Sequence, residues 1–164
     1  MLYCGSDGQN MKNQPIEIGD ALPEFSVKDQ NGNPVSNSTL QGRSVVLFFY
    51  PKDNSLICTK QACAFRDSYE AFLEYGCEVI GISSDDDKSH IYFSDKLRLP
   101  YRLISDKNNL LRDLFGVSSN LLGIIPGRVT YIADKNGIVR FKFNSQLSGS
   151  KHVKEALNYL AQHH

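Results

Sequence analysis

The hydrophobic pattern is strongest over residues 44–50, where β-branched, aliphatic and aromatic side chains follow one another without polar alternation. Such a run is typical of a central strand that is covered on both faces. Residues 78–83 have the same character and predict a second buried strand. Between the two, apolar side chains recur at helical spacing, which predicts a helix from about Cys58 to the glycine at position 76. The pattern therefore predicts a strand–helix–strand unit at the centre of the fold.

Shorter patterned segments flank this unit. They predict a hairpin over 25–35, a helical turn over 38–41, a helix capped at Ser84 and ending near 97, strands at 101–104, 128–133 and 138–143, and helices at 108–115 and 151–161. Alternating strands and helices require crossovers around a largely parallel sheet. The order predicts a thioredoxin-like three-layer α/β/α domain with a mixed central sheet and an N-terminal β-hairpin.

Length and charge narrow the class of protein. A chain of 164 residues is expected to form one domain, here residues 15–162 behind a flexible N-terminal tail at 1–14. Lysine and arginine together number 18, as do aspartate and glutamate, so no basic excess points to a nucleic-acid partner. The longest apolar runs, 45–50 and 121–126, are far shorter than the ~20 residues that span a bilayer. We expect a soluble monomer without a membrane span.

The number and spacing of the four cysteines and four histidines argue against a disulfide-stapled scaffold and against a zinc site. Four cysteines are too few to staple a chain of this length, and no Cys-x-x-Cys or zinc-ligand spacing occurs. The first 14 residues are polar and contain no apolar signal segment. These features predict a compartment that keeps thiols reduced, with the cytoplasm as the first expectation and a plastid as the alternative if a transit peptide has been removed.

Cys58 stands where a buried strand, a loop and a helix start follow one another. The free N–H groups and the positive end of the dipole at a helix N-terminus favour a thiolate over a thiol. Ser55, three residues earlier, offers a hydroxyl in the same pocket. The alternative is that Cys58 is a small buried hydrophobe, as many cysteines near helix starts are.

Cys63 follows five residues later. On an ideal helix that spacing separates the two Cα atoms by roughly 8–9 Å, whereas a disulfide needs less than about 7 Å. If Cys58 and Cys63 bond, the first turns of the helix must therefore unwind, which predicts local unfolding under redox control. The alternative for Cys63 is a plain core thiol.

The spacing Pro51-x-x-x-Ser55-x-x-Cys58 resembles the peroxidatic motif of peroxiredoxins, Pro-x-x-x-Thr/Ser-x-x-Cys. The longer run 49–67 is similar to the peroxiredoxin Q branch, also called the bacterioferritin comigratory protein branch. Residues 122–134 resemble the segment that carries the active-site arginine of this family, and residues 143–146 resemble cyanobacterial and plastid members. The resemblance covers residues 16–160.

The resemblance implies a thiol-specific peroxidase for hydrogen peroxide and organic hydroperoxides, with a part in antioxidant defence and redox homeostasis. It implies that Cys58 is the peroxidatic cysteine and that Cys63 resolves its sulfenic acid as an intramolecular disulfide. Arg128 corresponds to the arginine that stabilises thiolate and peroxide, Ser55 to the hydroxyl that bonds the peroxide, and Pro51 to the proline that shields the pocket. Thioredoxin or a similar dithiol protein would reduce the disulfide, and no metal or organic cofactor is implied.

Several positions depart from the family pattern or have plainer explanations. Ser55 stands in place of the usual Thr, and Leu56 in place of the Pro that is usual in this branch. Cys4 matches nothing in the pattern, and Cys77 is interpreted as a buried structural thiol. The acidic run 85–87 is interpreted as a capped helix start rather than a metal site, and the helix that carries His90 is expected to be largely solvated.

Two other functions remain open on sequence grounds. A redox sensor would use the disulfide as a switch of partner binding without sustained turnover. A general disulfide oxidoreductase would use the same fold, although the missing Cys-x-x-Cys argues against it. Steady-state turnover with peroxide separates the sensor from a peroxidase, and an insulin-reduction assay tests the oxidoreductase.

Overall fold

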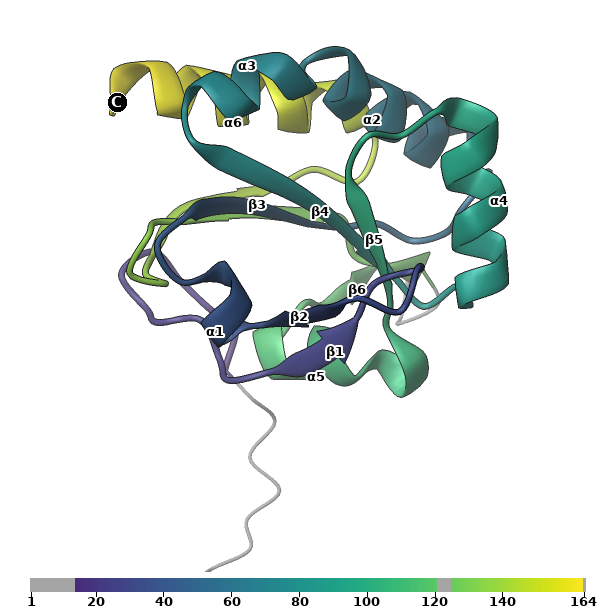
Figure 1. The fold of residues 1–164 in the computed structure, drawn as a ribbon, viewed down its shortest axis with the longest axis horizontal. Helices are drawn as coiled ribbons and strands as arrows, with labels where there is room; N and C mark the ends of the chain where they lie inside the picture. The colour runs from purple at the N-terminus through teal and green to yellow at the C-terminus, as the bar shows by residue number, and fades with distance from the viewer. Residues whose placement is uncertain (1–13, 121–124, 164) are drawn as a thin grey trace, which may run out of the picture.

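A computed structural model describes residues 14–120 and 125–163, and the tail predicted at 1–14 lies almost wholly outside this range. Its centre is a five-stranded mixed sheet in the order β5-β4-β3-β8-β9. Strands β3 (Ser44–Phe49), β4 (Cys77–Ser83) and β5 (Arg102–Ser105) run parallel, and β8 (Val129–Ala133) and β9 (Val139–Asn144) add an antiparallel side. Figure 1 shows this sheet between two layers, so the predicted three-layer α/β/α class with a mixed sheet is confirmed.

Strand β3 is central because its side chains are apolar on both faces. Val46 and Phe48 belong to one buried cluster, whereas Leu47 and Phe49 belong to the cluster on the other side of the sheet. Phe48 pairs with Gly81 of β4, and a Cβ at position 81 would lie 2.7 Å from the Phe48 ring. The glycine therefore makes room for an aromatic side chain in the middle of the sheet.

Helices cover one face of the sheet. They are α2 (Leu56–Asp67), α3 (Tyr69–Glu74), α4 (Asp87–Leu97) and α6 (Gly149–Gln162). Figure 1 shows α2, α3 and α6 together above the sheet and α4 beside β5. Phe65, Phe72, Phe93 and Val153 bring one apolar side chain from each of these helices into a shared core. This layer positions the N-terminus of α2 beside the ends of β3 and β4.

The opposite face carries smaller elements. They are the hairpin of β1 (Ser26–Lys28) and β2 (Pro34–Ser36), then α1 (Asn37–Leu40), the 3-10 turn η1 (Lys107–Asn109) and α5 (Leu110–Phe115). The first two strands pair antiparallel, so the predicted N-terminal hairpin is confirmed. Within the described residues, no helix is both long and apolar enough to cross a membrane.

The structure differs from the predicted elements in four places. The helix expected from Cys58 begins at Leu56, because Ser55 caps it, and it breaks at Ser68 into α2 and α3. The cap of α4 is Asp86 rather than Ser84, since the Asp86 carboxylate accepts the N–H of Ser89 at 2.8 Å. A short pair of strands, β6 (Ser119–Asn120) and β7 (Ile125–Pro126), was not predicted because each has only two residues and no periodicity to detect.

Candidate active site

Cys58 lies in the first turn of α2 with only 1% of its surface exposed. The Cys58 N–H donates to Oγ of Ser55 at 3.4 Å, and that hydroxyl donates to the carbonyl of Lys52 at 3.2 Å. Ser55 is extended, as a residue before a helix start should be. The sulfur therefore sits at the positive end of a twelve-residue helix.

Arg128 reaches the same sulfur from the other side of the fold. It directly precedes β8, and its side chain is almost completely buried. Its Nη1 donates to Sγ of Cys58 at 3.3 Å and to Oε1 of Gln61, and its Nε donates to the carbonyl of Gln146 at 3.1 Å. A cationic donor this close stabilises negative charge on sulfur. Residues 122–124 of the segment 122–134, which resembles the arginine segment of the family, lie outside the described residues.

Gln61 is a site residue that the motif comparison missed. It is fully buried one helical turn after Cys58, and its Nε2 finds no partner among the described residues. Gly149 allows α6 to approach it, since a Cβ at position 149 would lie 2.6 Å from Cβ of Gln61 and 2.8 Å from the carbonyl of Ile57. The spacing of three from Cys58 is the signal that could have identified Gln61, because residues at i and i+3 share one helix face.

Arg112 is a second residue without a predicted role. Its buried guanidinium donates to the carbonyls of Gly127 at 2.9 Å and of Tyr50 at 3.0 Å. Burial lowers its pKa, although the charges of Asp106 and Cys58 act in the opposite direction. Arg112 thereby links the end of β3, which leads to the Cys58 loop, to the residue before Arg128. Its signal in the sequence is weak, because one arginine on a short helix usually faces solvent.

The remaining predicted residues have clear positions. Cys63 is half-buried on α2, on the same uninterrupted helix as Cys58, and both are free thiols. Pro51 is half-buried directly after Tyr50, whereas the side chain of Leu56 is 74% exposed. Cys77 is fully buried, and desolvation raises its pKa to about 12. Cys4 lies outside the described residues.

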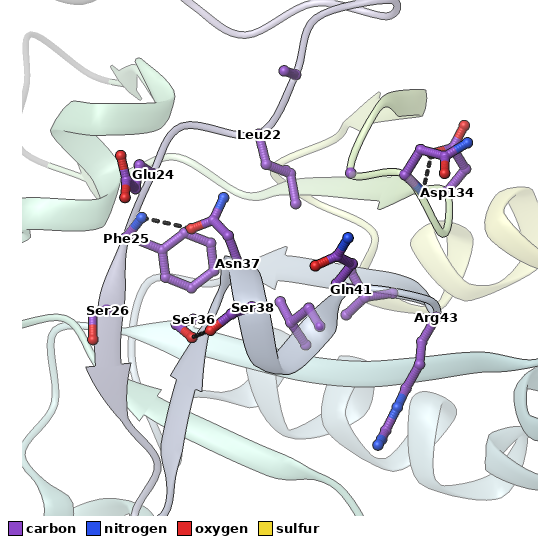
Figure 2. A pocket seen from close by; sticks show the side chains of 15 residues that line it. Leu22, Glu24, Phe25, Ser26, Ser36, Asn37, Ser38, Gln41, Arg43 and Asp134 are labelled. Carbon is purple, nitrogen blue, oxygen red and sulfur yellow. Dashed lines mark hydrogen bonds between the residues drawn. The ribbon is translucent and has the colours of Figure 1, made fainter.

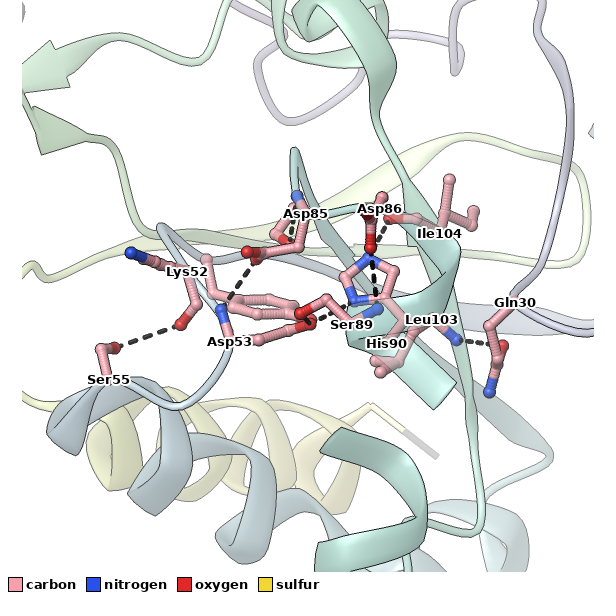
Figure 3. A network of polar contacts seen from close by, with 12 residues as sticks. Gln30, Lys52, Asp53, Ser55, Asp85, Asp86, Ser89, His90, Leu103 and Ile104 are labelled. Carbon is pink, nitrogen blue, oxygen red and sulfur yellow. Dashed lines mark hydrogen bonds and ion pairs between the residues drawn. The ribbon is translucent and has the colours of Figure 1, made fainter. Parts of the chain in front are cut away.

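The loop before Cys58 is fastened by polar contacts that Figure 3 shows. The Asp53 carboxylate bonds Nδ1 of His90 at 2.7 Å, and neither side chain reaches solvent. Most of α4 is exposed, as predicted, but His90 itself is fully buried, because its side of α4 faces the loop and β5. Asp53, Asp85 and His90 lie close enough to hold a metal ion, but both imidazole nitrogens already bond to protein oxygens.

A pocket of about 850 Å³ lies elsewhere, at the end of the sheet where β3 begins. Figure 2 shows Phe25, Asn37, Arg43 and Asp134 around it. Asn37 is engaged there with the backbone of Phe25 and Pro23. Because Cys58 follows the opposite end of β3, this pocket is separate from the thiol site.

Comparison with known proteins identifies the family. The model of the AhpC/TSA family matches residues 18–142. This chain belongs to the AhpC/TSA family. It is 54% identical to the chloroplastic peroxiredoxin Q of Arabidopsis thaliana and 52% identical to that of Suaeda salsa, each over 88% of this chain, covering 67% and 68% of those proteins respectively.

Solved structures agree with the sequence comparison. Peroxidoxin BcpB from Mycobacterium tuberculosis superposes with a TM-score of 0.82 at 35% identity, covering 90% of this chain and 97% of that one. A mutant of peroxiredoxin Q from Xylella fastidiosa gives a TM-score of 0.83 at 25% identity, covering 92% and 99%. The resemblance to the peroxiredoxin Q branch is thus confirmed, and the chain is a thiol peroxidase, an oxidoreductase. The two plant relatives are named as chloroplastic, so they give no support to the cytoplasmic expectation.

Proposed function

We propose that this peroxidase acts through Cys58 as its peroxidatic cysteine. The observation that carries the proposal is the 3.3 Å contact between Sγ of Cys58 and Nη1 of Arg128 at the N-terminus of α2. The thiolate attacks the terminal oxygen of a hydroperoxide, so that an S–O bond forms and the O–O bond breaks. The remaining oxygen leaves as water or an alcohol after taking up a proton, and Cys58 is oxidised to a sulfenic acid.

Arg128 stabilises the charge that develops on the leaving oxygen, because its guanidinium is buried and already oriented by Gln61 and the carbonyl of Gln146. The Ser55 hydroxyl donates to the carbonyl of Lys52 and accepts the N–H of Cys58 with one lone pair. Its second lone pair is free to accept a hydrogen bond from a peroxide O–H. Pro51, half-buried at the start of the same loop, limits access of water to the sulfur. In this proposal Arg128 and Ser55 orient the peroxide between them.

Cys63 then resolves the sulfenic acid. Its sulfur attacks the sulfur of Cys58, an S–S bond forms, and the hydroxyl group leaves as water. Ideal geometry separates the two Cα atoms by roughly 8–9 Å along an intact helix, so the first turns of α2 must unwind for the step to occur. A thioredoxin-type dithiol reduces the resulting disulfide and allows the helix to refold.

We extend the proposal to the wider setting of the reaction. The substrates are hydrogen peroxide and organic hydroperoxides, and the role is antioxidant defence and redox homeostasis. The catalytic unit is residues 15–162 acting as a monomer. The chloroplastic names of the plant relatives favour a plastid location over the cytoplasm.

Peroxide consumption coupled to a thioredoxin system tests this assignment. Cys58→Ser should abolish turnover, and Cys63→Ser should allow one oxidation of Cys58 but prevent recycling by thioredoxin. Cys77→Ala is the matched control, since that thiol is buried away from Arg128 and should be dispensable. Turnover retained in Cys58→Ser would refute the peroxidatic role, and normal recycling in Cys63→Ser would refute the resolving role.

A further inference from the structure

Asp53, five residues before Cys58, is the most heavily bonded side chain of the loop between β3 and α2. Its carboxylate accepts hydrogen bonds from the Tyr50 hydroxyl at 2.6 Å and the Ser89 hydroxyl at 2.9 Å, and it bonds Nδ1 of His90 at 2.7 Å. Its exposure is 3%, and that of His90 is zero. We call Tyr50, Asp53, Asp85, Ser89 and His90 the Asp53 network.

The backbone of the same residue is fixed as well. The N–H of Asp53 donates to Oδ2 of Asp85 at 2.8 Å, and that oxygen also accepts the Ser83 hydroxyl at 2.6 Å. Nε2 of His90 lies 3.1 Å from the carbonyl of Ile104. The loop is thus attached to the ends of β4 and β5 and to α4, as Figure 3 shows.

The partners of His90 favour an ion pair. A carbonyl oxygen can only accept, so Nε2 must carry a proton, and Nδ1 faces a carboxylate that also receives two hydroxyl donors. Burial by itself lowers the pKa of His90, but the hydrogen bond and charge of Asp53, the carbonyl of Ile104 and the charge of Asp85 outweigh it and raise the pKa. A charge-assisted bond in a dry site is short and directional, which suits a fixed attachment point.

We propose that Asp53 and His90 are positioning residues for the peroxidatic cysteine, holding the loop so that the first turn of α2 keeps Cys58 against Arg128. This inference rests on the proposed function. A short path of bonds connects the two places: Lys52, next to Asp53, accepts the Ser55 hydroxyl, and Ser55 accepts the N–H of Cys58. Asn54 between them has a left-handed backbone, φ 63°, which asparagine adopts more readily than most residues.

The Asp53 network also defines how far the unwinding of α2 can extend toward the loop. Formation of the Cys58–Cys63 disulfide needs the turns after Ser55 to open, and Asp53 lies two residues before that boundary. Weakening the Asp53 network favours the unwound form, in which Cys58 has left Arg128. Attack on peroxide then slows, whereas disulfide formation, which needs the unwound form, becomes faster.

The test measures the two steps separately in single-turnover experiments. Asp53→Asn keeps the shape of the side chain but removes its charge. We expect its rate constant for oxidation of Cys58 by hydrogen peroxide to fall about tenfold and its rate constant for disulfide formation to rise, with full reaction amplitude. Asp134→Asn is the matched control. Like Asp53, the Asp134 carboxylate holds three hydrogen bonds, here from two backbone N–H groups and Arg140, but it lies in the β8–β9 turn, away from Cys58.

The opposite movement of the two rate constants is the decisive readout. If Asp53→Asn leaves both rates unchanged, or lowers both together with the folded fraction, the network is only structural and the inference is overturned. Ser89→Ala, which removes one donor to Asp53, should show the same opposite changes at smaller size and serves if Asp53→Asn does not fold. Peroxide turnover retained in Cys58→Ser would instead refute the proposed function itself, so the two failures are distinguishable.

Discussion

The thiol site has two sides, the loop that leads to Cys58 and the segment around Arg128, and a buried histidine forms hydrogen bonds on each side. His90 supports the loop that leads to Cys58, and His152 of α6 supports the segment around Arg128. His152 receives the Thr130 hydroxyl at 2.8 Å on Nδ1, and its Nε2 bonds the carbonyl of Ser145 at 2.7 Å. Thr130 lies two residues after Arg128, and Ser145 precedes the residue whose carbonyl accepts the Arg128 guanidinium.

These two histidines are equally buried, but their pKa values shift in opposite directions because their partners differ. His90 faces a carboxylate, and its pKa is raised. His152 faces a hydroxyl and a carbonyl, so burial, helped by the nearby charge of Arg128, lowers its pKa to about 4 despite the bond to Ser145. The Cys58 side is therefore held by an ion pair, and the Arg128 side by a neutral hydrogen-bonded ring that adds no second cation next to the guanidinium.

The largest expected effect on the peroxide reaction comes from removing the Arg128 guanidinium, which contacts Cys58 directly. Arg128→Met deletes the donor to Cys58 Sγ and leaves Oε1 of Gln61 and the carbonyl of Gln146 without that partner. The second-order rate constant for peroxide should fall roughly 10²- to 10³-fold. Arg128→Lys should recover part of the loss, because it restores the charge but not the planar fork. Equal rates for the two variants would contradict the role of this geometry.

Acid sensitivity should come from the His152 side. The folded protein keeps His152 neutral down to about pH 4, whereas in the unfolded chain it binds a proton below its ordinary pKa of about 6.5. The free energy of unfolding should therefore fall as the pH drops between those values, by up to about 3 kcal/mol from this group. Urea unfolding of wild type and His152→Gln at pH 7 and pH 4.5 measures it.

The control in that experiment is the pH slope of the variant. Glutamine can still donate to the carbonyl of Ser145 but does not titrate, so the slope of stability against pH should be shallower in His152→Gln than in wild type. Identical slopes would show that other groups cause the acid sensitivity.

The His90 side should respond to pH with the opposite sign. A raised folded pKa means that its ion pair with Asp53 contributes fully below the ordinary histidine pKa and that the contribution is lost as the pH rises through the folded pKa. The stability difference between wild type and His90→Asn should accordingly shrink as the pH increases above 7. Chemical unfolding across pH 6 to 9 checks this, and a difference that grows with pH would contradict the ion pair. Asp53, Asp85 and Tyr50 are the titratable groups around His90.

The difference between the regions also explains what the sequence could predict. The central strand β3 and the Cys58 motif are local features, readable from consecutive residues. Arg128 could be assigned only through the family resemblance, since an isolated arginine before a strand is usually exposed. The partners of the site could not be read in this way, because Asp53 and His90 are 37 positions apart, and Arg112 and Tyr50 are 62 apart.

His90 shows what the sequence pattern of α4 could not reveal. The segment Asp87–Leu97 is rich in charged residues, which predicts a solvated helix. The two residues that follow His90, Ile91 and Tyr92, are indeed exposed. The face that carries His90 and Phe93 is buried, and the histidine is tolerated there because a carboxylate from another element meets it. Pattern alone does not reveal such a partner, since it depends on where the loop after β3 is placed by the sheet.

The smallest expected effect concerns Cys77, a buried thiol outside the site that can be compared with Cys58. Cys77 is as buried as Cys58, but its sulfur bonds the carbonyl of Glu78 and the backbone of Val46 instead of a guanidinium, and burial raises its pKa to about 12. Brief treatment of the folded protein with a thiol-alkylating reagent at pH 8 should modify Cys58 and leave Cys77 unmodified, as peptide mass mapping would show. Arg128→Met should slow modification of Cys58 without changing Cys77. Rapid labelling of Cys77 would mean that the guanidinium does not control which buried thiol reacts, and the contrast between the two thiols would lose its basis.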